Sequence, residues 1–305
     1  MSIKAERFLR AAAENLEPLR GTFIHPQVIR DLREKTEQVD SGYGRWLAAL
    51  LPWLCARCGL DRPPRVLDFG CGSGELAVLM NSLGYDAVGV DVHAVHLRLA
   101  RILAEENGLS ADRFVLHEGG PLPFPDGAFD IVTMDSVLEH VSDEVLEQVL
   151  PELRRVCSGV VFALAPNRLK THDDHTGLAL VTWLPRGLAA MYVRARGPYH
   201  RYGISKDSSW DVYSRTFWSA RHRFEQHGFS VEFVPDELVY PPLEVARPLY
   251  ELGAGRGWKA LLVAPVRGLC RVLVAMGTPR QAFYPYFNLV MTRAGRRPAP
   301  GPAGV

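Results

Sequence analysis

The chain has 305 residues, with 35 Lys and Arg against 34 Asp and Glu, so its formal net charge is +1. Apolar residues make up 47% of the sequence, which is typical of a globular protein. The balanced charge disfavours a protein that binds nucleic acid mainly through its phosphates, because such binding needs an excess of basic residues.

The earliest predicted element is an N-terminal helical cap over residues 1–64, which ends at Pro63 and Pro64. Short apolar strands then alternate with helices as far as residue 164, and the alternation resumes at residue 216. This pattern predicts an α/β fold with a parallel sheet that helices cover on both faces. The strands are expected at 65–69, 86–90, 113–117, 129–134, 159–164, 229–234 and 286–292, and the helices among them at 75–83, 93–107, 143–157 and 216–227.

Two insertions interrupt this pattern. Residues 167–215 are too many for a simple connection and are rich in His, Asp, Tyr and Trp, so we expect an ordered lid over a substrate. Residues 241–281 form a second, helical insertion, and the Pro- and Gly-rich tail at 293–305 is expected to be disordered. The main domain is therefore expected to span residues 65–292.

The five cysteines are odd in number and widely spaced, which is typical of reduced thiols. Cys55 and Cys58 form a CxxC pair, but no second pair follows, and cysteines three residues apart on a helix share an apolar face. The N-terminus lacks the apolar core of a signal peptide, and the apolar stretch at 260–276 is interrupted by proline, glycine and arginine. We therefore expect a cytoplasmic protein without a membrane-spanning helix.

A glycine-rich turn directly follows the first predicted strand. It carries Gly70, Gly72 and Gly74 after Asp68, and its GxGxG spacing departs from the GxGxxG of dinucleotide-binding proteins. Asp91 ends the second strand, 19 residues after Gly72, where a carboxylate can accept hydrogen bonds from both hydroxyls of a ribose. The combination predicts a ligand of the adenosine type.

Three segments, VLDFGCGSGELA, GVDV and HEGGPLPFPDGAFDIVTMDSVLEHV, resemble the motifs of class I S-adenosylmethionine-dependent methyltransferases. The similarity covers residues 65–166, resumes at EQHGFSVEF and the last strand, and is greatest to the small-molecule subgroup that includes quinone-biosynthesis methyltransferases. The resemblance implies a Rossmann-like, seven-stranded, mostly parallel sheet with an antiparallel last strand. It also implies S-adenosyl-L-methionine as the methyl donor.

The same resemblance implies a donor site at eight positions. Asp68 and Gly70 would lie near the amino-acid end of the donor, Gly72 and Gly74 would leave room for it, and Asp91 would hold the ribose hydroxyls. Asp68 could instead cap the turn, and Asp91 could cap the next helix.

The remaining three positions of that site lie further along the chain. Glu118 stands where the family usually has Asp and would reach the adenine amino group, with a backbone contact from Gly119. Asp135 would line the donor methionine and the substrate mouth. Glu118 has an alternative explanation as a solvated loop acid.

Methyl transfer to a hydroxyl requires a base for the hydroxyl proton, and the lid segment concentrates candidates. The candidates there are His172, Asp173, His175 and His200. The same side chains could be solvated, could cap a helix, or could include ligands of a divalent metal, although four adjacent loop residues cannot all face one ion. His140, in the LEHV motif, is a further candidate base, or it orients its own loop. No metal is predicted.

A basic amphipathic helix is predicted at residues 256–276, with Arg256, Lys259, Arg267 and Arg271 beside an apolar stripe. Such a helix can lie on an anionic membrane, or it can pack its apolar stripe on the sheet or on a second copy of the chain.

Taken together, the sequence predicts an enzyme of the methyltransferase class EC 2.1.1 that methylates a small molecule. The acceptor is expected to be a hydroxyl of a natural product, saccharide or quinone-like compound, and no nucleic-acid partner is expected. Two alternatives are a C- or N-methyltransferase that acts mainly by proximity and a noncatalytic protein that binds S-adenosylmethionine.

Overall fold

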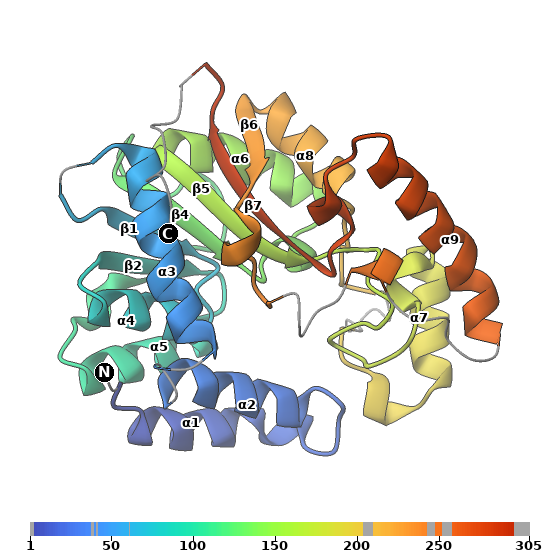
Figure 1. The fold of residues 1–305 in the computed structure, drawn as a ribbon. Coiled ribbons are helices and arrows are strands. Elements are labelled where there is room, and N and C mark those ends of the chain that lie inside the picture. The colour runs from blue at the N-terminus through green and yellow to red at the C-terminus, as the bar shows by residue number, and fades with distance from the viewer. Residues whose placement is uncertain are drawn as a thin grey trace.

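A single seven-stranded sheet with the order β3-β2-β1-β4-β5-β7-β6 forms the centre of the computed structural model (Figure 1). The structure describes residues 3–37, 40, 42–60, 62–203, 210–242, 248–251 and 258–295. All neighbouring strands are parallel except β7, which is antiparallel to both β5 and β6. The predicted α/β fold with an antiparallel last strand is therefore confirmed. The strands are β1 Arg65–Phe69, β2 Asp86–Asp91, β3 Phe114–Leu116, β4 Phe129–Asp135, β5 Cys157–Pro166, β6 Phe229–Phe233 and β7 Tyr286–Arg293.

Helices cover both faces of the sheet. They are α1 Glu6–Leu16, α2 His25–Thr36, α3 Gly42–Cys58, α4 Glu75–Ser82, α5 Ala94–Glu106, α6 Asp143–Val156, α7 Arg186–Ala195, α8 Phe217–Gln226 and α9 Trp258–Ala275. Alternate residues of each strand enter different apolar clusters: Val66 packs with α3, α4 and α5, whereas its neighbour Leu67 packs with α6 and α8. The strands are apolar on both sides because helices bury both faces.

Two elements differ in length from the predictions, and both differences have a local cause. β3 has three residues instead of the predicted five, because the chain at Ala111–Arg113 forms a 3₁₀ turn, and β3 pairs only with β2. β5 starts at Cys157 and runs to Pro166, longer than the predicted 159–164, because β7 pairs with it as far as Pro166.

The N-terminal helices are attached to the rest of the fold by hydrogen bonds between side chains and backbone groups. At the start of α1, the N–H groups of Arg7 and Phe8 donate to the Glu106 carboxylate of α5, at 2.8 and 2.9 Å. In α3, the Trp46 indole donates to the Leu238 carbonyl at 2.8 Å. The cap therefore covers the sheet on the side of α4 and α5 (Figure 1).

The two ends of the insertion at residues 167–215 lie side by side, where Asn167 and Arg215 form a parallel bridge. The Arg215 guanidinium is buried and donates to the carbonyls of Leu138 and Val141, which fastens the insertion to the loop after β4. The segment contains α7 and a small apolar core of its own. That core consists of Leu178, Val181, Ala189, Ala190, Val193, Trp210 and Val212.

The second insertion lies between β6 and β7 and contains α9, drawn at the right of Figure 1. One side of α9 packs on the core through buried Cys270 and half-buried Val266 and Leu273. The other side exposes apolar side chains, with Leu261 77% and Leu269 58% exposed. Arg256 and the tail at 296–305 lie outside the described residues. Among the helices that the structure describes, none has both the length and the apolarity to cross a membrane.

Candidate functional site

The glycine turn after β1 is held in a conformation that favours glycine. Gly70, Gly72 and Gly74 have φ angles of 75°, 51° and 83°. A Cβ at Gly70 would lie 2.6 Å from the Val137 side chain, and one at Gly74 would lie 2.7 Å from Ala100. A Cβ at Gly72 would meet nothing within 4 Å. Gly70 and Gly74 therefore permit close packing within the protein, and the open space lies at Gly72.

Two carboxylates are buried beside this turn without a full set of partners. Asp68 accepts a hydrogen bond from Thr133 on Oδ1 at 3.0 Å, while its Oδ2 has no partner among the described residues. Oε1 of Glu75, at the start of α4, is likewise buried and unpaired there. Burial, followed by the charge of Asp135, raises the pKa of Asp68 to about 7. Burial also raises the pKa of Glu75. Such a pair suits a ligand with a cationic, hydrogen-donating group.

Asp135, at the end of β4, is ion-paired to the N-terminal cap. The Lys35 ammonium lies 3.1 Å from Asp135 Oδ2, and the Tyr43 hydroxyl donates to the same oxygen at 2.5 Å. Burial alone would raise the pKa of Asp135, but Lys35 and Tyr43 outweigh burial and lower it. No motif marked Lys35 or Tyr43 as site residues, because only the tertiary contact between α2, α3 and β4 brings them there.

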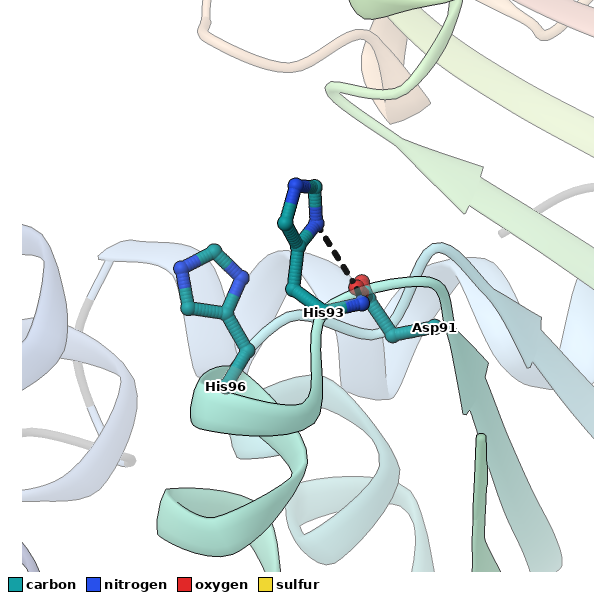
Figure 2. A group of neighbouring side chains, drawn as sticks. All are labelled: Asp91, His93 and His96. Carbon is teal, nitrogen blue, oxygen red and sulfur yellow. Dashed lines mark hydrogen bonds and ion pairs between the residues drawn. The ribbon is translucent and has the colours of Figure 1, made fainter. Parts of the chain in front are cut away.

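Asp91 holds two loops together at the end of β2. Its carboxylate accepts hydrogen bonds from the N–H of Gly72 at 2.9 Å and from the N–H of His93 at 2.8 Å. Figure 2 shows the His93 ring over the same carboxylate, at 3.2 Å, with His96 one turn further along α5. Each carboxylate oxygen has two lone pairs, so Asp91 keeps acceptor capacity for a ligand.

Glu118 and Gly119 lie on the surface in the loop after β3. The His117 N–H donates to the Asp91 carbonyl at 3.0 Å, so this loop starts beside the end of β2. Two apolar side chains are exposed at the same edge, Val92 at 54% and Leu116 at 40%. Exposed apolar groups next to polar ones are typical of a ligand-binding edge.

A second cluster joins the LEHV motif to the insertion. Glu139 is 3% exposed, and its Oε2 has no hydrogen-bond partner among the described residues. The rings of His140 and His175 pack edge to face with centroids 5.0 Å apart, and Tyr202 stacks on His175 at 5.7 Å. The His175 Nδ1 lies 3.3 Å from the Asp173 carboxylate.

Burial changes the pKa values of this cluster. It raises the pKa of Glu139 to about 7. Packing around the partly open His140 ring, followed by the charge of His175, lowers the pKa of His140 to about 4. Burial would also lower the pKa of His175, but Asp173 outweighs burial and raises it. His140 is therefore a neutral imidazole at neutral pH.

The structure brings together only some of the candidate bases from the sequence. His140, Asp173 and His175 lie in one cluster. His172 is exposed, with its ring 3.3 Å from the Thr171 hydroxyl, and the His200 ring bonds the Thr176 carbonyl at 2.7 Å. Asp173 also accepts from the backbone and hydroxyl of Thr176, so it fixes its own turn. The sequence did not single out Glu139 as a site residue, because only its burial and its proximity to the insertion mark it as one.

Comparison with known proteins gives the family. A family model described as "Methyltransferase domain" matches residues 66–159. The ubiquinone biosynthesis O-methyltransferase of Bartonella quintana is 31% identical over 194 residues, which cover 60% of this chain and 72% of that protein. The chain belongs to the class I S-adenosylmethionine-dependent methyltransferases.

Other members of this methyltransferase family match over shorter stretches. The demethylmenaquinone methyltransferase of Thermus thermophilus is 41% identical over 96 residues, 31% of this chain and 42% of that protein. The chain spans about half the length of several curated relatives, such as 49% of the Chelativorans ubiquinone biosynthesis O-methyltransferase. A solved S-adenosylmethionine-dependent methyltransferase from Mesorhizobium loti is 16% identical, with a TM-score of 0.49, and the match covers 84% of this chain and all of that one.

The methyltransferase match at 66–159 contains every donor-site position named from the sequence and also His140. The candidate bases of the insertion lie beyond it. The CxxC pair also lies outside the match. Its Cys58 is buried and contacts the Asp130 carbonyl at 3.4 Å, and Cys55 is half-buried.

Proposed function

We propose that this methyltransferase transfers a methyl group from S-adenosyl-L-methionine to a hydroxyl of a small molecule. The observation that carries the donor assignment is the unpaired, buried Asp68 Oδ2 beside the open space at Gly72. S-adenosylmethionine has an ammonium group, which can donate to Asp68. The methyl group that it supplies is on a sulfonium and is already activated.

The other donor contacts follow from the same edge of the sheet. Asp91 would accept the ribose hydroxyls with its remaining lone pairs, and the exposed Val92 and Leu116 would contact the adenine faces. Glu118 would accept from the adenine amino group, with a backbone contact from Gly119. Asp135, held ionised by Lys35, would place a negative charge near the sulfonium.

The acceptor would bind between this edge and the insertion at 167–215, which we propose acts as a lid that orients the acceptor and excludes water. The hydroxyl proton would pass to an imidazole nitrogen of His140 or His175. An oxygen lone pair would then form the new C–O bond while the C–S bond breaks, with its electron pair left on sulfur. Asp173 would stabilise the protonated His175.

A quinone-like phenol is the acceptor class that we favour among hydroxyl compounds, because relatives over the matched region are named for ubiquinone and demethylmenaquinone. Saccharide and other natural-product hydroxyls would use the same base. A carbon or nitrogen acceptor would depend more on proximity and less on deprotonation.

The proposal is tested by incubating the protein with S-adenosylmethionine and panels of catechols and hydroquinones. A product heavier by one methyl group, together with formation of S-adenosylhomocysteine, is expected. Donor binding without product across acceptors of all three atom types would favour a noncatalytic binding protein. If a base acts, alanine at His140, His172, Asp173, His175 or His200 should lower turnover by roughly 10²- to 10⁴-fold in at least one variant without loss of donor binding.

We also propose that α9 docks on an anionic membrane surface while its other side packs on the core. The helix contains Lys259, Arg267 and Arg271 and no acidic residue, and it exposes Leu261, Leu269 and Val272. A lipophilic acceptor would reach the enzyme from such a surface. The odd number and wide spacing of the five cysteines favour a reducing compartment, so we place the enzyme on the cytoplasmic side. Self-association through the same face is the alternative.

A further inference from the structure

Three side chains from two separate segments offer metal-ligand atoms at one point. A carboxylate oxygen of Glu139 and one ring nitrogen each of His140 and His175 all lie within 4.8 Å of one another. Glu139 and His140 end the 3₁₀ turn Leu138–His140 after β4, and His175 belongs to the insertion. The turn is fixed to the insertion, because the Tyr213 N–H donates to the Glu139 carbonyl at 2.7 Å.

The buried Glu139 carboxylate lacks a partner that a cation would supply. Only 3% of the Glu139 surface is exposed, and its Oε2 atom receives no hydrogen bond from any described residue. An unpaired buried carboxylate oxygen costs free energy, and a charged one costs more. Binding of a cation to this oxygen would satisfy it.

His175 is oriented as a metal ligand by a second carboxylate. Asp173 lies 3.3 Å from Nδ1, which leaves Nε2 as the nitrogen available for an ion. Asp173 is itself fixed by the N–H and the hydroxyl of Thr176, both at 2.7 Å. A carboxylate behind a ligating imidazole is a common support of metal sites, because it fixes the tautomer and the ring orientation.

We propose that Glu139, His140 and His175 bind a divalent transition-metal ion of the Zn²⁺ type. Two imidazoles and one carboxylate suit Zn²⁺, whereas Mg²⁺ and Ca²⁺ prefer oxygen ligands alone. Three protein ligands leave a coordination position open, and His140 is exposed to solvent. The group Asp91, His93 and His96 has similar atoms, but Asp91 already accepts two backbone hydrogen bonds, and its remaining lone pairs are assigned to the donor ribose.

The role of the ion rests on the proposed function. A divalent ion lowers the pKa of a hydroxyl that coordinates it. With the ion bound, His140 and His175 would act as its ligands and not as the base, and the hydroxyl proton would pass to water. Val137, two residues before Glu139, packs against Gly70 of the donor turn, so the cluster adjoins the donor edge. The ion would thus hold the acceptor oxygen beside the donor.

The test uses the full chain without a histidine tag, freed of metal by a chelator and titrated with Zn²⁺ in a calorimeter. One equivalent is expected to bind. Glu139→Gln, His140→Ala and His175→Ala should each weaken binding at least tenfold, and Asp173→Asn should weaken it roughly 10- to 100-fold. His222→Ala, which removes an exposed imidazole from α8, and the double change His93→Ala with His96→Ala should leave it unaltered.

Absence of stoichiometric binding, or binding that survives the three ligand variants, would overturn the metal site. Thermal melts of Glu139→Gln and of the exposed His140→Ala identify misfolded variants, so at least one ligand variant remains informative. S-adenosylhomocysteine affinity and methyl transfer are measured on the same samples. Methyl transfer without Zn²⁺ binding removes the metal proposal alone, and Zn²⁺ binding without transfer to any acceptor removes the proposed function alone.

Discussion

The Lys35 ammonium lies 3.1 Å from the Asp135 carboxylate, so the second helix of the N-terminal cap is ion-paired to the end of the central strand β4. Asp135 is nearly buried, with 9% of its side chain exposed, and Lys35 is 27% exposed. The pair therefore connects the cap to the edge where the donor is proposed to bind.

Replacing Lys35 should therefore destabilise the folded protein. We expect Lys35→Met to lower the free energy of unfolding by roughly 3 kcal/mol, because it leaves Asp135 buried and charged. Urea unfolding at neutral pH measures the loss, and Lys4→Met, at an exposed position, is the control. The pKa of Asp135 is lowered in the folded state, so its contribution is present above the ordinary value of 3.8 and is lost as the pH falls below it. A loss under 0.5 kcal/mol would show that the pair contributes little.

In contrast to Asp135, the Asp68 carboxylate should destabilise the ligand-free folded protein at neutral and alkaline pH. Its pKa is raised from 3.8 to about 7, so the folded state takes up a proton that the unfolded state has released, and stability falls as the pH rises between these values. We expect Asp68→Asn to stabilise the ligand-free protein by roughly 2 to 4 kcal/mol at pH 8 and by much less at pH 4. Thermal and urea unfolding at both pH values check this, with the exposed Asp112→Asn as the control. Equal effects at both pH values would contradict the raised pKa.

The same carboxyl predicts a proton linkage on donor binding. Near pH 6, Asp68 is largely protonated without ligand, and the ammonium of S-adenosylhomocysteine should favour its ionised form. Binding is therefore expected to release a proton at pH 6 and almost none at pH 9. Calorimetry in buffers with different ionisation enthalpies measures the release. Asp68→Asn should abolish it, and an unchanged release in that variant would assign the proton to another group.

Asp91→Ala is expected to weaken S-adenosylhomocysteine binding by at least tenfold. It removes the acceptor for the Gly72 and His93 N–H groups and the proposed acceptor for the ribose, and a hydrogen bond to a charged group contributes about 1.5 to 3 kcal/mol. His93→Ala keeps the carboxylate and serves as the matched control. A folded Asp91→Ala protein with native affinity would rule out this placement of the ribose.

The exposed side of α9 should bind anionic vesicles. Co-sedimentation is expected with phosphatidylglycerol vesicles, less with phosphatidylcholine, and less in high salt. The double change Leu261→Ser with Leu269→Ser should reduce binding, whereas Val145→Ser, an exposed apolar residue of α6, should not. Absence of vesicle binding, together with a dimer that the same double change dissociates, would instead indicate a second copy on this face.

Local features of the sequence predicted the order of the elements and the donor edge. Short continuous apolar runs in the strands and helical spacing between them are properties of neighbouring residues, so they can be recognised without the fold. The positive φ angles at Gly70, Gly72 and Gly74 confirm a tight glycine turn for the same reason. Gly72 and Asp91 are 19 positions apart in the sequence, with one helix and one strand along the way, and the two residues meet through a hydrogen bond.

Only the tertiary structure decided which distant side chains share a site. Lys35 and Tyr43 meet Asp135 across about a hundred residues, and Glu139 and His140 meet His175 because Arg215 fastens the insertion to the loop after β4. These contacts depend on which surfaces are buried together, and no local pattern encodes that. The two sides of α9 show the same limit: its sequence predicts an amphipathic helix, but the packing of Cys270 on the core determines which apolar residues remain exposed.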